Sequence, residues 1–517
     1  MSAPPAAGSP GSRAATRLRA FTESYGRWLS LPVGALLALA FAPAGAWPLA
    51  FLCPAFLMLC WEGVAPREAA WRGLLFTAGT FLAGTYWLYH SIHLIGHAPV
   101  WVTLVLMLGM VAIMGGYTAL LGYAAARWGR DGGPLRFLAL LPAGWVLTEW
   151  VRGWFLSGFP WLALGYSQLD TPLAAYAPVG GVYLVSLGVA VTAGALVLLV
   201  TGSRRARTAA VVALLLAWGC ALALGRVAWT QPRGTEVTVA LVQGAVPQSM
   251  KWAPGQLEST MNLYLELTIP HLGVGIIVWP ESAIPSLESG IRDYLDQVTA
   301  LAASRGSSLI TGLVRRDAQS GAYYNAMAAW SPHEQWYYKR RLVPFGEFFP
   351  VPAAVRDWMR LMNLPYSDFA AGTETQRPLV AGGEALAPTI CYEDAYGVEQ
   401  LPLARESTLL VNVTNDAWFG DSSAPHQHLD ISRMRSLETG RPMLRATNDG
   451  VTALIAYDGR VIDSLSQFQP GVLTGTVEPR TGFTPYLRAG NWPVLALLAI
   501  GLIAGFRRAR HARVVPG

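Results

Sequence analysis

The chain has 517 residues, of which 53% are hydrophobic and only 14% are charged, and its mean hydropathy is +0.34. Soluble domains carry about a quarter charged residues, so this composition excludes a disordered chain and a nucleic-acid scaffold and disfavours a soluble enzyme. The net charge of +6 is modest, and the 20 Trp residues suit a membrane protein, because indole rings anchor at lipid–water boundaries.

Long apolar runs recur along the first half of the chain, and one more lies near its C-terminus. Each is close to the roughly 20 residues that a helix needs to cross a bilayer. The N-terminal segment is not expected to be a cleaved signal peptide, because several spans follow it. The runs predict a polytopic α-helical membrane bundle of eight spans, at about 28–44, 46–63, 71–91, 99–125, 135–152, 172–201, 208–226 and 490–506.

The distribution of Arg residues predicts how these spans are oriented. Arg is concentrated before the first span, in alternate connections and in the C-terminal tail, whereas the other short connections contain only Arg152. Positively charged connections stay in the cytoplasm, so both termini are expected inside and the long segment after the seventh span outside. The predicted parts are a cytoplasmic segment, a seven-span bundle, an external domain, an eighth span and a cytoplasmic tail, at 1–27, 28–227, 228–488, 489–506 and 507–517.

The external segment alternates short β-type stretches with helical ones, which predicts a layered α/β domain. The helices are expected at 257–269, 291–304 and 426–439. The strands are expected at 235–243, 275–279, 308–314, 322–330, 386–391, 408–414, 443–447, 452–457 and 471–477.

Two scarce residue types mark candidate chemistry in this domain. Cys391 is its one cysteine, and Lys251 and Lys339 are the only lysines of the chain. An external compartment favours disulfide pairs, so an unpaired thiol there indicates a function, the alternative being an inert core cysteine. Lysine differs from arginine as a compact charge whose pKa responds to burial. Lys251 is expected at the surface or in contact with substrate.

Three of these features fit nucleophilic catalysis. Cys391 follows an apolar strand and a turn can expose its thiol, which needs a neighbouring base or cation to become a thiolate. Glu281 also follows an apolar strand, where burial suits a carboxyl group to shuttle a proton, although a helix cap or a salt bridge is an equal alternative. Lys339 can supply positive charge to a developing oxyanion.

The residues around these three resemble a known family. W-P-E-S at Glu281, Y-Y-K-R-R-L-V-P-F-G-E at Lys339 and I-C-Y-E-D at Cys391 are similar to the Glu–Lys–Cys triad motifs of the nitrilase superfamily. The match is closer to its membrane branch, the apolipoprotein N-acyltransferases, through E-W-V-R-G-W at 149–154 and Q-G-A-V-P-Q-S-M-K-W at 243–252. The resemblance implies an αββα sandwich, and a site that also contains Glu347, Tyr392 and Glu393.

The resemblance also implies the reaction and its partners. An acyl chain, the sn-1 chain of phosphatidylethanolamine, would pass through a Cys391 thioester to the N-terminal amine of the S-diacylglyceryl-cysteine of a prolipoprotein. Membrane lipid is then a partner, nucleic acid is not, no cofactor or metal is expected, and a monomer suffices. The location implied is the bacterial inner membrane, with a periplasmic catalytic domain. The alternatives are a membrane-anchored amidase and a non-catalytic lipid- or peptide-binding protein.

Aromatic side chains are candidates for substrate contact, namely Trp252, Phe345 and Trp161. Core packing or an aromatic belt at the membrane boundary is the alternative for each. Two further features have no assigned role. His90, His93 and His97 are spaced to lie on one helical face, where metal binding is disfavoured, and Glu149 is expected to pair with Arg152. His426 and His428 suggest a Cys–His pair, which nitrilase chemistry does not need.

Overall fold

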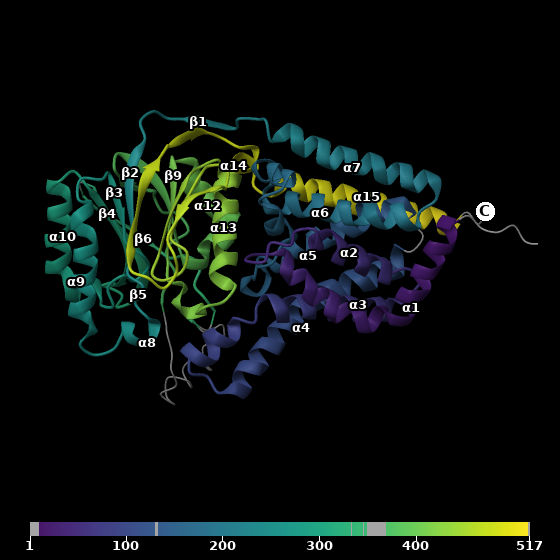
Figure 1. Ribbon diagram of the computed structural model, residues 1–517, viewed down its shortest axis with the longest axis horizontal. Helices are drawn as coiled ribbons and strands as arrows, with labels where there is room; N and C mark the ends of the chain where they lie inside the picture. The colour runs from purple at the N-terminus through teal and green to yellow at the C-terminus, as the bar shows by residue number, and fades with distance from the viewer. Residues whose placement is uncertain (1–9, 130–132, 332, 345, 349–368, 515–517) are drawn as a thin grey trace, which may run out of the picture. The chain divides into compact units, whose positions relative to one another are not determined.

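The computed structural model describes residues 10–129, 133–331, 333–344, 346–348 and 369–514 (Figure 1). The chain divides into two compact units. The first, here called the helical unit, comprises Met1–Val227 and Ala489–Gly517. The second, the sandwich unit, is Ala228–Arg488 and contains the predicted catalytic residues.

Helices make up the helical unit, because its sequence is rich in Leu, Ala and other good helix formers. Pro stands at the first turn of α3, α5 and α6, where its missing N–H costs no hydrogen bond. The helices are α1 (Pro10–Leu37), α2 (Leu49–Cys60), α3 (Pro66–Gly84), α4 (Val100–Trp128), α5 (Leu141–Arg152), α6 (Ala177–Thr201), α7 (Arg204–Leu224) and α15 (Trp492–Val514).

Each predicted span overlaps one of these helices. Within the described residues, four helical stretches are long and apolar enough to cross a membrane: Val100–Trp128, Pro172–Thr201, Arg204–Leu224 and Trp492–His511. Leu49–Cys60 is apolar but shorter. These four helices support the interpretation of the chain as a membrane protein, and the count of eight spans stays a prediction.

Two helices of this unit have bounds that differ from those of the predicted spans. The first span was expected at 28–44, but α1 begins at Pro10 and ends at Leu37, because the Ala- and Arg-rich residues before the apolar run also favour a helix. The helix α3 ends at Gly84, and a π-helix follows at His90–Ile95. His97 lies beyond that π-helix with φ of 54°, so the three histidines do not share one α-helical face.

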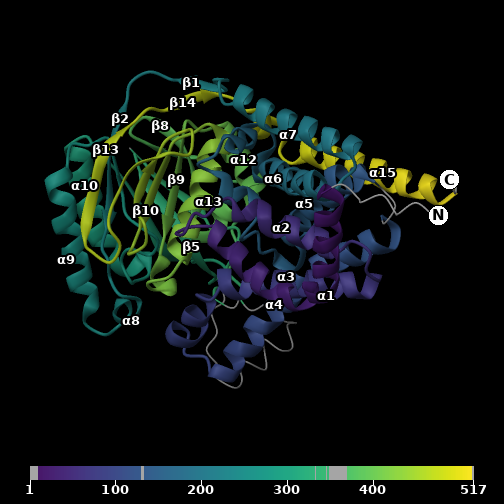
Figure 2. The ribbon, with the colours of Figure 1, turned by 45° about the vertical axis from the view of Figure 1, so that its right-hand side comes forward.

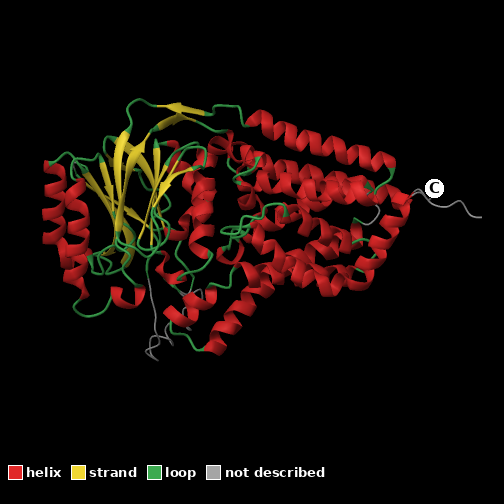
Figure 3. Cartoon of the chain, in the orientation of Figure 1, coloured by secondary structure: helices red, strands yellow, loops and turns green. Residues whose placement is uncertain are grey.

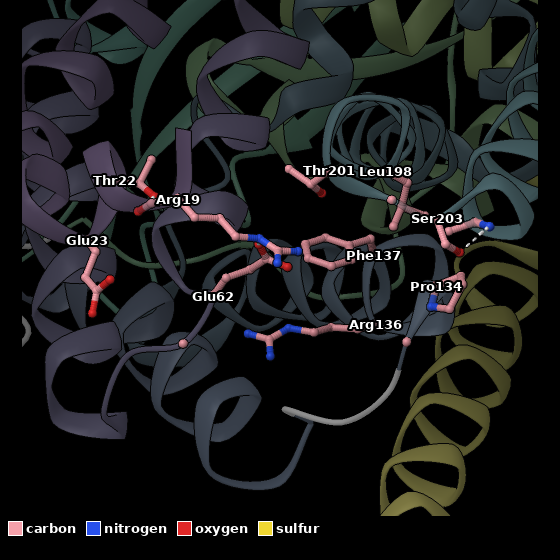
Figure 4. A pocket seen from close by; sticks show the side chains of 14 residues that line it. Arg19, Thr22, Glu23, Glu62, Pro134, Arg136, Phe137, Leu198, Thr201 and Ser203 are labelled. Carbon is pink, nitrogen blue, oxygen red and sulfur yellow. Dashed lines mark hydrogen bonds and ion pairs between the residues drawn. The ribbon is translucent and has the colours of Figure 1, made fainter. Parts of the chain in front are cut away.

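A pocket of about 550 Å³ opens in the helical unit (Figure 4). Arg19, Glu62, Arg136 and Ser203 are among the residues that line it. Figure 4 shows Arg19 reaching toward Glu62, with which it forms an ion pair at 3.0 Å. None of the predicted catalytic residues lines this pocket, so its volume says nothing about the catalytic chemistry.

Two six-stranded sheets form the sandwich unit, and they share one pattern. Each has parallel strands at its centre and antiparallel strands toward its edges. The first sheet has the order β13 (Gly471–Val477), β2 (Val237–Gln243), β3 (Ile276–Val278), β4 (Ser308–Arg316), β5 (Tyr323–Trp330), β6 (Glu334–Tyr338). The second has the order β12 (Val461–Ser464), β11 (Ala453–Ile455), β10 (Met443–Thr447), β9 (Leu409–Thr414), β8 (Glu384–Ile390), β7 (Leu379–Ala381).

The sheets lie face to face between two layers of helices (Figure 3). Helices α9 (Gln256–Thr268) and α10 (Arg292–Ser304) cover one side, and α12 (Gly397–Arg405) and α13 (Ala424–Thr439) cover the other, as Figures 1 and 2 both show. Between the sheets, fully buried aliphatic side chains from both make one core, which includes Leu241, Ile276, Leu386 and Val411. The unit is thus an αββα sandwich, as the resemblance implied.

All nine predicted strands and all three predicted helices of this unit are present; β10 and β13 have the predicted bounds, and the others have shifted ends. The strand expected at 386–391 stops at Ile390, because Cys391 turns into a short 3₁₀ helix, Cys391–Ala395. The short strands β6, β7 and β12, the helix α12, and a small pairing of β1 (Thr230–Pro232) with β14 (Arg480–Gly482) were not predicted.

Candidate active site

The three predicted catalytic residues follow strands of both sheets. Glu281 comes after β3 and Lys339 directly after β6, both in the first sheet, and Cys391 comes directly after β8 in the second. In open α/β sheets, ligands bind beyond the carboxyl ends of parallel strands, which is where β3 and β8 place Glu281 and Cys391. The two sheets therefore supply one site together.

Glu281 is 7% exposed, and each oxygen of its carboxylate accepts a hydrogen bond. Oε1 accepts from Asn325 Nδ2 at 2.7 Å, and Oε2 accepts from the backbone N–H of Asn415 at 3.0 Å. The Lys339 ammonium lies 3.4 Å from Oε1. These contacts come from β5, from the end of β9 and from the end of β6, so they fix the carboxylate from three directions.

Lys339 is 1% exposed and lies between two carboxylates. Its Nζ is 2.9 Å from Glu347 Oε1 and 3.4 Å from Glu281 Oε1. Burial lowers the pKa of Lys339, but the charges of Glu347 and Glu281 outweigh burial and raise the pKa well above its ordinary value. The ammonium therefore stays charged throughout the ordinary pH range.

Cys391 holds an uncommon backbone conformation, with φ of 53°. A non-glycine residue at positive φ is strained and is kept only by firm surroundings. The residue is 8% exposed. Burial raises the pKa of its thiol above the usual range, and the Glu281 charge adds to this, while Lys339 opposes it. The thiol is protonated at rest and needs a base to react.

The three residues that the resemblance added to the site have different surroundings. Glu347 contacts Lys339 and also accepts from Asn325 Nδ2 at 2.7 Å and from the backbone N–H of Val343 at 2.8 Å. The Tyr392 hydroxyl contacts that of Tyr396. Glu347 therefore holds the ammonium, whereas the hydroxyl of Tyr392 contacts the residue that directly follows its own 3₁₀ turn.

Glu393 joins two loops and does not contact the thiol. Its Oε1 accepts from the backbone N–H groups of Arg340 at 2.6 Å and Arg341 at 3.1 Å, and its Oε2 accepts from that of Ile390 at 2.8 Å. The Tyr337 hydroxyl donates to both oxygens. Glu393 thus ties the segment that follows Lys339 to the residue that precedes Cys391.

Asn325 and Asn415 are functional candidates that sequence reasoning missed. The only signal for Asn325 is a polar residue at a buried position of the strand β5, and Asn415 acts through its backbone N–H, which no side-chain pattern reveals. Lys251, expected at the surface or in contact with substrate, is 1% exposed and donates to the Glu281 carbonyl at 3.4 Å. Its burial lowers its pKa to about 8.

Comparisons with known proteins decide the family. Two family models match the chain: the model of the apolipoprotein N-acyltransferase N-terminal domain matches residues 33–195, and the model of carbon-nitrogen hydrolases matches residues 238–486. The apolipoprotein N-acyltransferase of Pseudomonas putida is 43% identical over 495 residues, which is 95% of this chain and 98% of the relative. This chain belongs to the apolipoprotein N-acyltransferase family.

Another curated relative agrees with that assignment. The apolipoprotein N-acyltransferase of Methylococcus capsulatus is 41% identical over 94% of this chain and 96% of its own. Among solved structures, a CN-hydrolase superfamily protein from Xanthomonas campestris has 18% identity and a TM-score of 0.36, and covers 52% of this chain and 97% of its own. Membership of the apolipoprotein N-acyltransferase family makes the chain an enzyme of the acyltransferase class, within the carbon–nitrogen hydrolase superfamily.

The three predicted substrate contacts are placed differently. Trp252, in the sandwich unit, is 55% exposed although its neighbour Lys251 is buried. Trp161, in the helical unit, is buried and stacks on Phe159 with ring centroids 6.0 Å apart. Phe345 lies outside the described residues. An exposed indole is available to a ligand, so Trp252 is the candidate that the structure favours.

The charges of Glu149 and Arg152 interact, as predicted, and both side chains also form hydrogen bonds with other groups. Glu149 Oε1 accepts from Trp145 Nε1 and from the backbone N–H of Leu164, both at 3.0 Å. Arg152 donates to the carbonyl groups of Phe159 and Trp161. Both residues therefore stabilise the loop after α5. Within the described residues, no group of three or more His, Cys, Asp or Glu side chains could hold a metal ion.

Proposed function

We propose that the chain transfers an acyl chain from a phospholipid, through a thioester on Cys391, to the N-terminal amine of S-diacylglyceryl-cysteine in a lipoprotein. The observation that carries this proposal is the convergence of a buried carboxylate, a buried ammonium and the one thiol of the sandwich unit at the strand ends of a family member. Phosphatidylethanolamine is the proposed donor, through its sn-1 chain.

In the first half-reaction, Glu281 takes the thiol proton and the Cys391 sulfur attacks the ester carbonyl carbon. The Lys339 ammonium and the backbone N–H of Tyr392 stabilise the resulting oxyanion. The carbon–oxygen bond of the ester then breaks, and the lysophospholipid leaves with the proton from Glu281. The acyl chain stays on Cys391 as a thioester.

In the second half-reaction, the α-amine of the lipoprotein attacks the thioester carbonyl. Glu281, ionised again, takes a proton from the amine, and the carbon–sulfur bond breaks as the amide forms. The proton returns from Glu281 to the sulfur, which restores the thiol. Glu347 and Asn325 keep the Lys339 ammonium and the Glu281 carboxylate in place through both steps.

We also propose the membrane arrangement in which these steps take place. Eight spans with the Arg-rich connections inside would put both termini in the cytoplasm and the sandwich unit in the periplasm, at the bacterial inner membrane. Both substrates keep their acyl chains in lipid, so the thiol would work close to the outer face of that membrane. One complete set of catalytic residues in each chain supports a monomer.

The decisive experiment is an intact-mass measurement. Detergent-purified protein is incubated with phosphatidylethanolamine alone, next to Cys391→Ser. The expected result is a gain of one acyl chain that neutral hydroxylamine removes and that the variant lacks. Free fatty acid without an adduct would instead identify a hydrolase. The absence of both adduct and free fatty acid would favour a lipid-binding protein. Both outcomes would overturn the proposal.

A further inference from the structure

A second cluster of charged groups lies directly beneath the nucleophile. Asp394, Asp416, His428 and Arg445 are each 0–1% exposed. They come from four elements: the 3₁₀ turn that begins at Cys391, the 3₁₀ turn after β9, α13 and β10. The two-step reaction proposed above uses none of them, and burying four charges in one place is costly unless each is paired.

His428 stands between the two carboxylates of this cluster. Its Nδ1 is 2.9 Å from Asp416 Oδ1, and its Nε2 is 3.0 Å from Asp394 Oδ1 and 3.3 Å from the carbonyl oxygen of Cys391. Ionised carboxylates and carbonyl groups only accept hydrogen bonds, so both ring nitrogens act as donors. Burial and Arg445 lower the pKa of His428, but Asp394 and Asp416 outweigh them and raise it to about 9.

Arg445 completes the charge balance of the cluster. It donates to Asp416 Oδ2 at 3.0 Å and to Asn412 Oδ1 at 2.8 Å, and lies 3.6 Å from Asp394 Oδ2. Two cations and two anions therefore sum to zero. Burial raises the pKa of Asp416, but the charges of His428 and Arg445 outweigh it and keep that pKa below its usual value.

A second donor reaches the same carbonyl oxygen. Asn412 Nδ2 donates to the Cys391 oxygen at 3.1 Å and to Thr389 Oγ1 at 3.0 Å. The orientation of this amide is fixed, because Arg445 donates to its oxygen on the other side. The carbonyl group of Cys391 thus accepts from His428 and from Asn412, and the ionic cluster holds both donors.

The geometry of the peptide bond links this carbonyl group to the chemistry. The Cys391 carbonyl and the Tyr392 N–H belong to one planar trans peptide, in which C=O and N–H point in opposite directions. Two donors that hold the carbonyl against the cluster therefore turn the N–H away from it. Cys391 needs such support, because its φ of 53° is strained for a non-glycine residue.

We propose that His428 and Asn412 are positioning residues that lock the Cys391–Tyr392 peptide, so that the Tyr392 N–H points at the oxyanion of the acyl-transfer reaction. This inference rests on the proposed function. The cluster supplies the rigidity: ion pairs hold its two cations and two anions together below the thiol, and its net charge of zero leaves the charge that the substrate meets unchanged. Preorganised donors of this kind stabilise a transition state because they need no reorganisation during the reaction.

Two variants of His428 separate the donor from the charge. In His428→Gln, the side-chain amide can still donate at the position of Nε2, whereas in His428→Asn the shorter amide replaces Nδ1 and the donor to Cys391 is lost. The test is the single-turnover rate at which phosphatidylethanolamine acylates each variant, followed by intact-mass measurement. The acylation rate of His428→Asn is expected to be at least about tenfold below that of wild type, since removing one oxyanion donor outright costs about 10²–10³ in rate. The acylation rate of His428→Gln is expected to lie between those of His428→Asn and wild type.

Alkylation by iodoacetamide is the second readout, because this displacement forms no oxyanion. A misdirected Tyr392 N–H slows acylation but leaves the alkylation rate of Cys391 and the KM for the phospholipid unchanged. The matched control is His426→Asn, on the same helix, where the histidine contacts Gln467 at 3.1 Å. This control is expected to behave as wild type in both reactions.

Three results would overturn the proposal: equal acylation by wild type and His428→Asn, a parallel fall in acylation and alkylation, and an effect as large in His426→Asn. If His428→Asn fails to melt cooperatively, the same two measurements on Asn412→Asp test the proposal. This variant keeps the side-chain shape and the Arg445 contact but removes the donor from residue 412 to the Cys391 carbonyl oxygen. Failure of wild type to form an acyl-enzyme would instead contradict the proposed function, so the two failures are distinct.

Discussion

Asn325 donates a hydrogen bond of 2.7 Å to Glu281 and, from the same amide nitrogen, a second of 2.7 Å to Glu347. One side-chain amide therefore bridges the two carboxylates that flank the Lys339 ammonium. The backbone continues the link, because Lys339 N donates to the Asn325 carbonyl at 2.9 Å. The four residues form one unit in which a proposed base and a proposed oxyanion donor are held by the same neighbour.

Substitution of Asn325 tests that unit. Asn325→Ala is expected to lower kcat by about 10–100-fold with the phospholipid KM unchanged, since a hydrogen bond to a charged group is worth about 1.5–3 kcal/mol. Asn325→Asp is expected to be worse, because a third carboxylate would repel Glu281 and Glu347. Steady-state kinetics check both. A rise in KM alone would assign Asn325 to substrate binding instead.

Lys339 is expected to be irreplaceable by arginine. The side chain is 1% exposed and fits between two carboxylates, whereas a guanidinium is larger and planar and directs its donors differently. Lys339→Arg and Lys339→Met should both form the acyl-enzyme at least about 100-fold more slowly, measured by quenched intact mass. If Arg alone restored the rate to within tenfold, positive charge without its position would be sufficient.

Glu393 is expected to act through the stability of the fold. In Glu393→Gln the amide would face backbone N–H groups that now donate to a carboxylate, and an unsatisfied buried donor costs about 1–3 kcal/mol. The melting midpoint should fall by about 5 °C, measured by differential scanning fluorimetry. Glu399→Gln is the matched control, because its pair with Arg341 is partly exposed and ion pairs near the surface contribute little. Equal midpoints for both variants would contradict the role.

The charge of His428 makes a prediction about pH. Its pKa in the folded state is raised from 6.5 to about 9, so its stabilisation is complete below about pH 6.5 and is lost as pH rises through about 9. The groups that face it are Asp394, Asp416 and Arg445. The melting midpoint of wild type should exceed that of His428→Gln most at about pH 6, and this difference should shrink by about pH 10. A constant difference would show that the imidazole is neutral.

Trp252 is expected to contact the lipid substrate. The indole is 55% exposed and can bury apolar area against a ligand. Trp252→Ala should raise the phospholipid KM about tenfold, with kcat and the melting midpoint unchanged. Leu301→Ala, on the outer helix α10 and 37% exposed, is the control and should leave KM as in wild type. A lower midpoint with KM unchanged would make Trp252 a packing residue.

The sequence predicted the parts of the fold that rest on local pattern. Strands such as β2, β4 and β9 are buried apolar runs, so composition alone located them. The strands β6, β7 and β12 were missed because they are only three to five residues long and lie at sheet edges. Cys391, Glu281 and Lys339 could be named in advance because each follows a strand, two belong to scarce residue types, and the motifs around all three resemble those of the nitrilase superfamily.

The rest of the site depends on distances through space. Asn325 and Glu347 meet Lys339 from separate elements, and Asn415 contributes only a backbone N–H. His428 was considered only as a partner of the thiol, whereas its ring contacts the carbonyl oxygen of Cys391. No spacing rule in one sequence encodes such contacts, since the residues involved lie between 8 and 134 positions apart.

The pairing of β2 with β13 can form only late in the synthesis of the chain. β2 is the first long strand of the unit to be made and β13 the last, yet the two are joined along their whole length, from Val237 opposite Val477 to Gln243 opposite Gly471. Proteins emerge from the ribosome from the N-terminus at about 5–20 residues per second, so the first sheet stays open at that edge until synthesis of the unit is nearly complete. Glu281 and Lys339 belong to that sheet. A stalled or truncated chain is therefore expected to carry the thiol without a finished catalyst around it, and acyl transfer begins only in a chain that is almost whole.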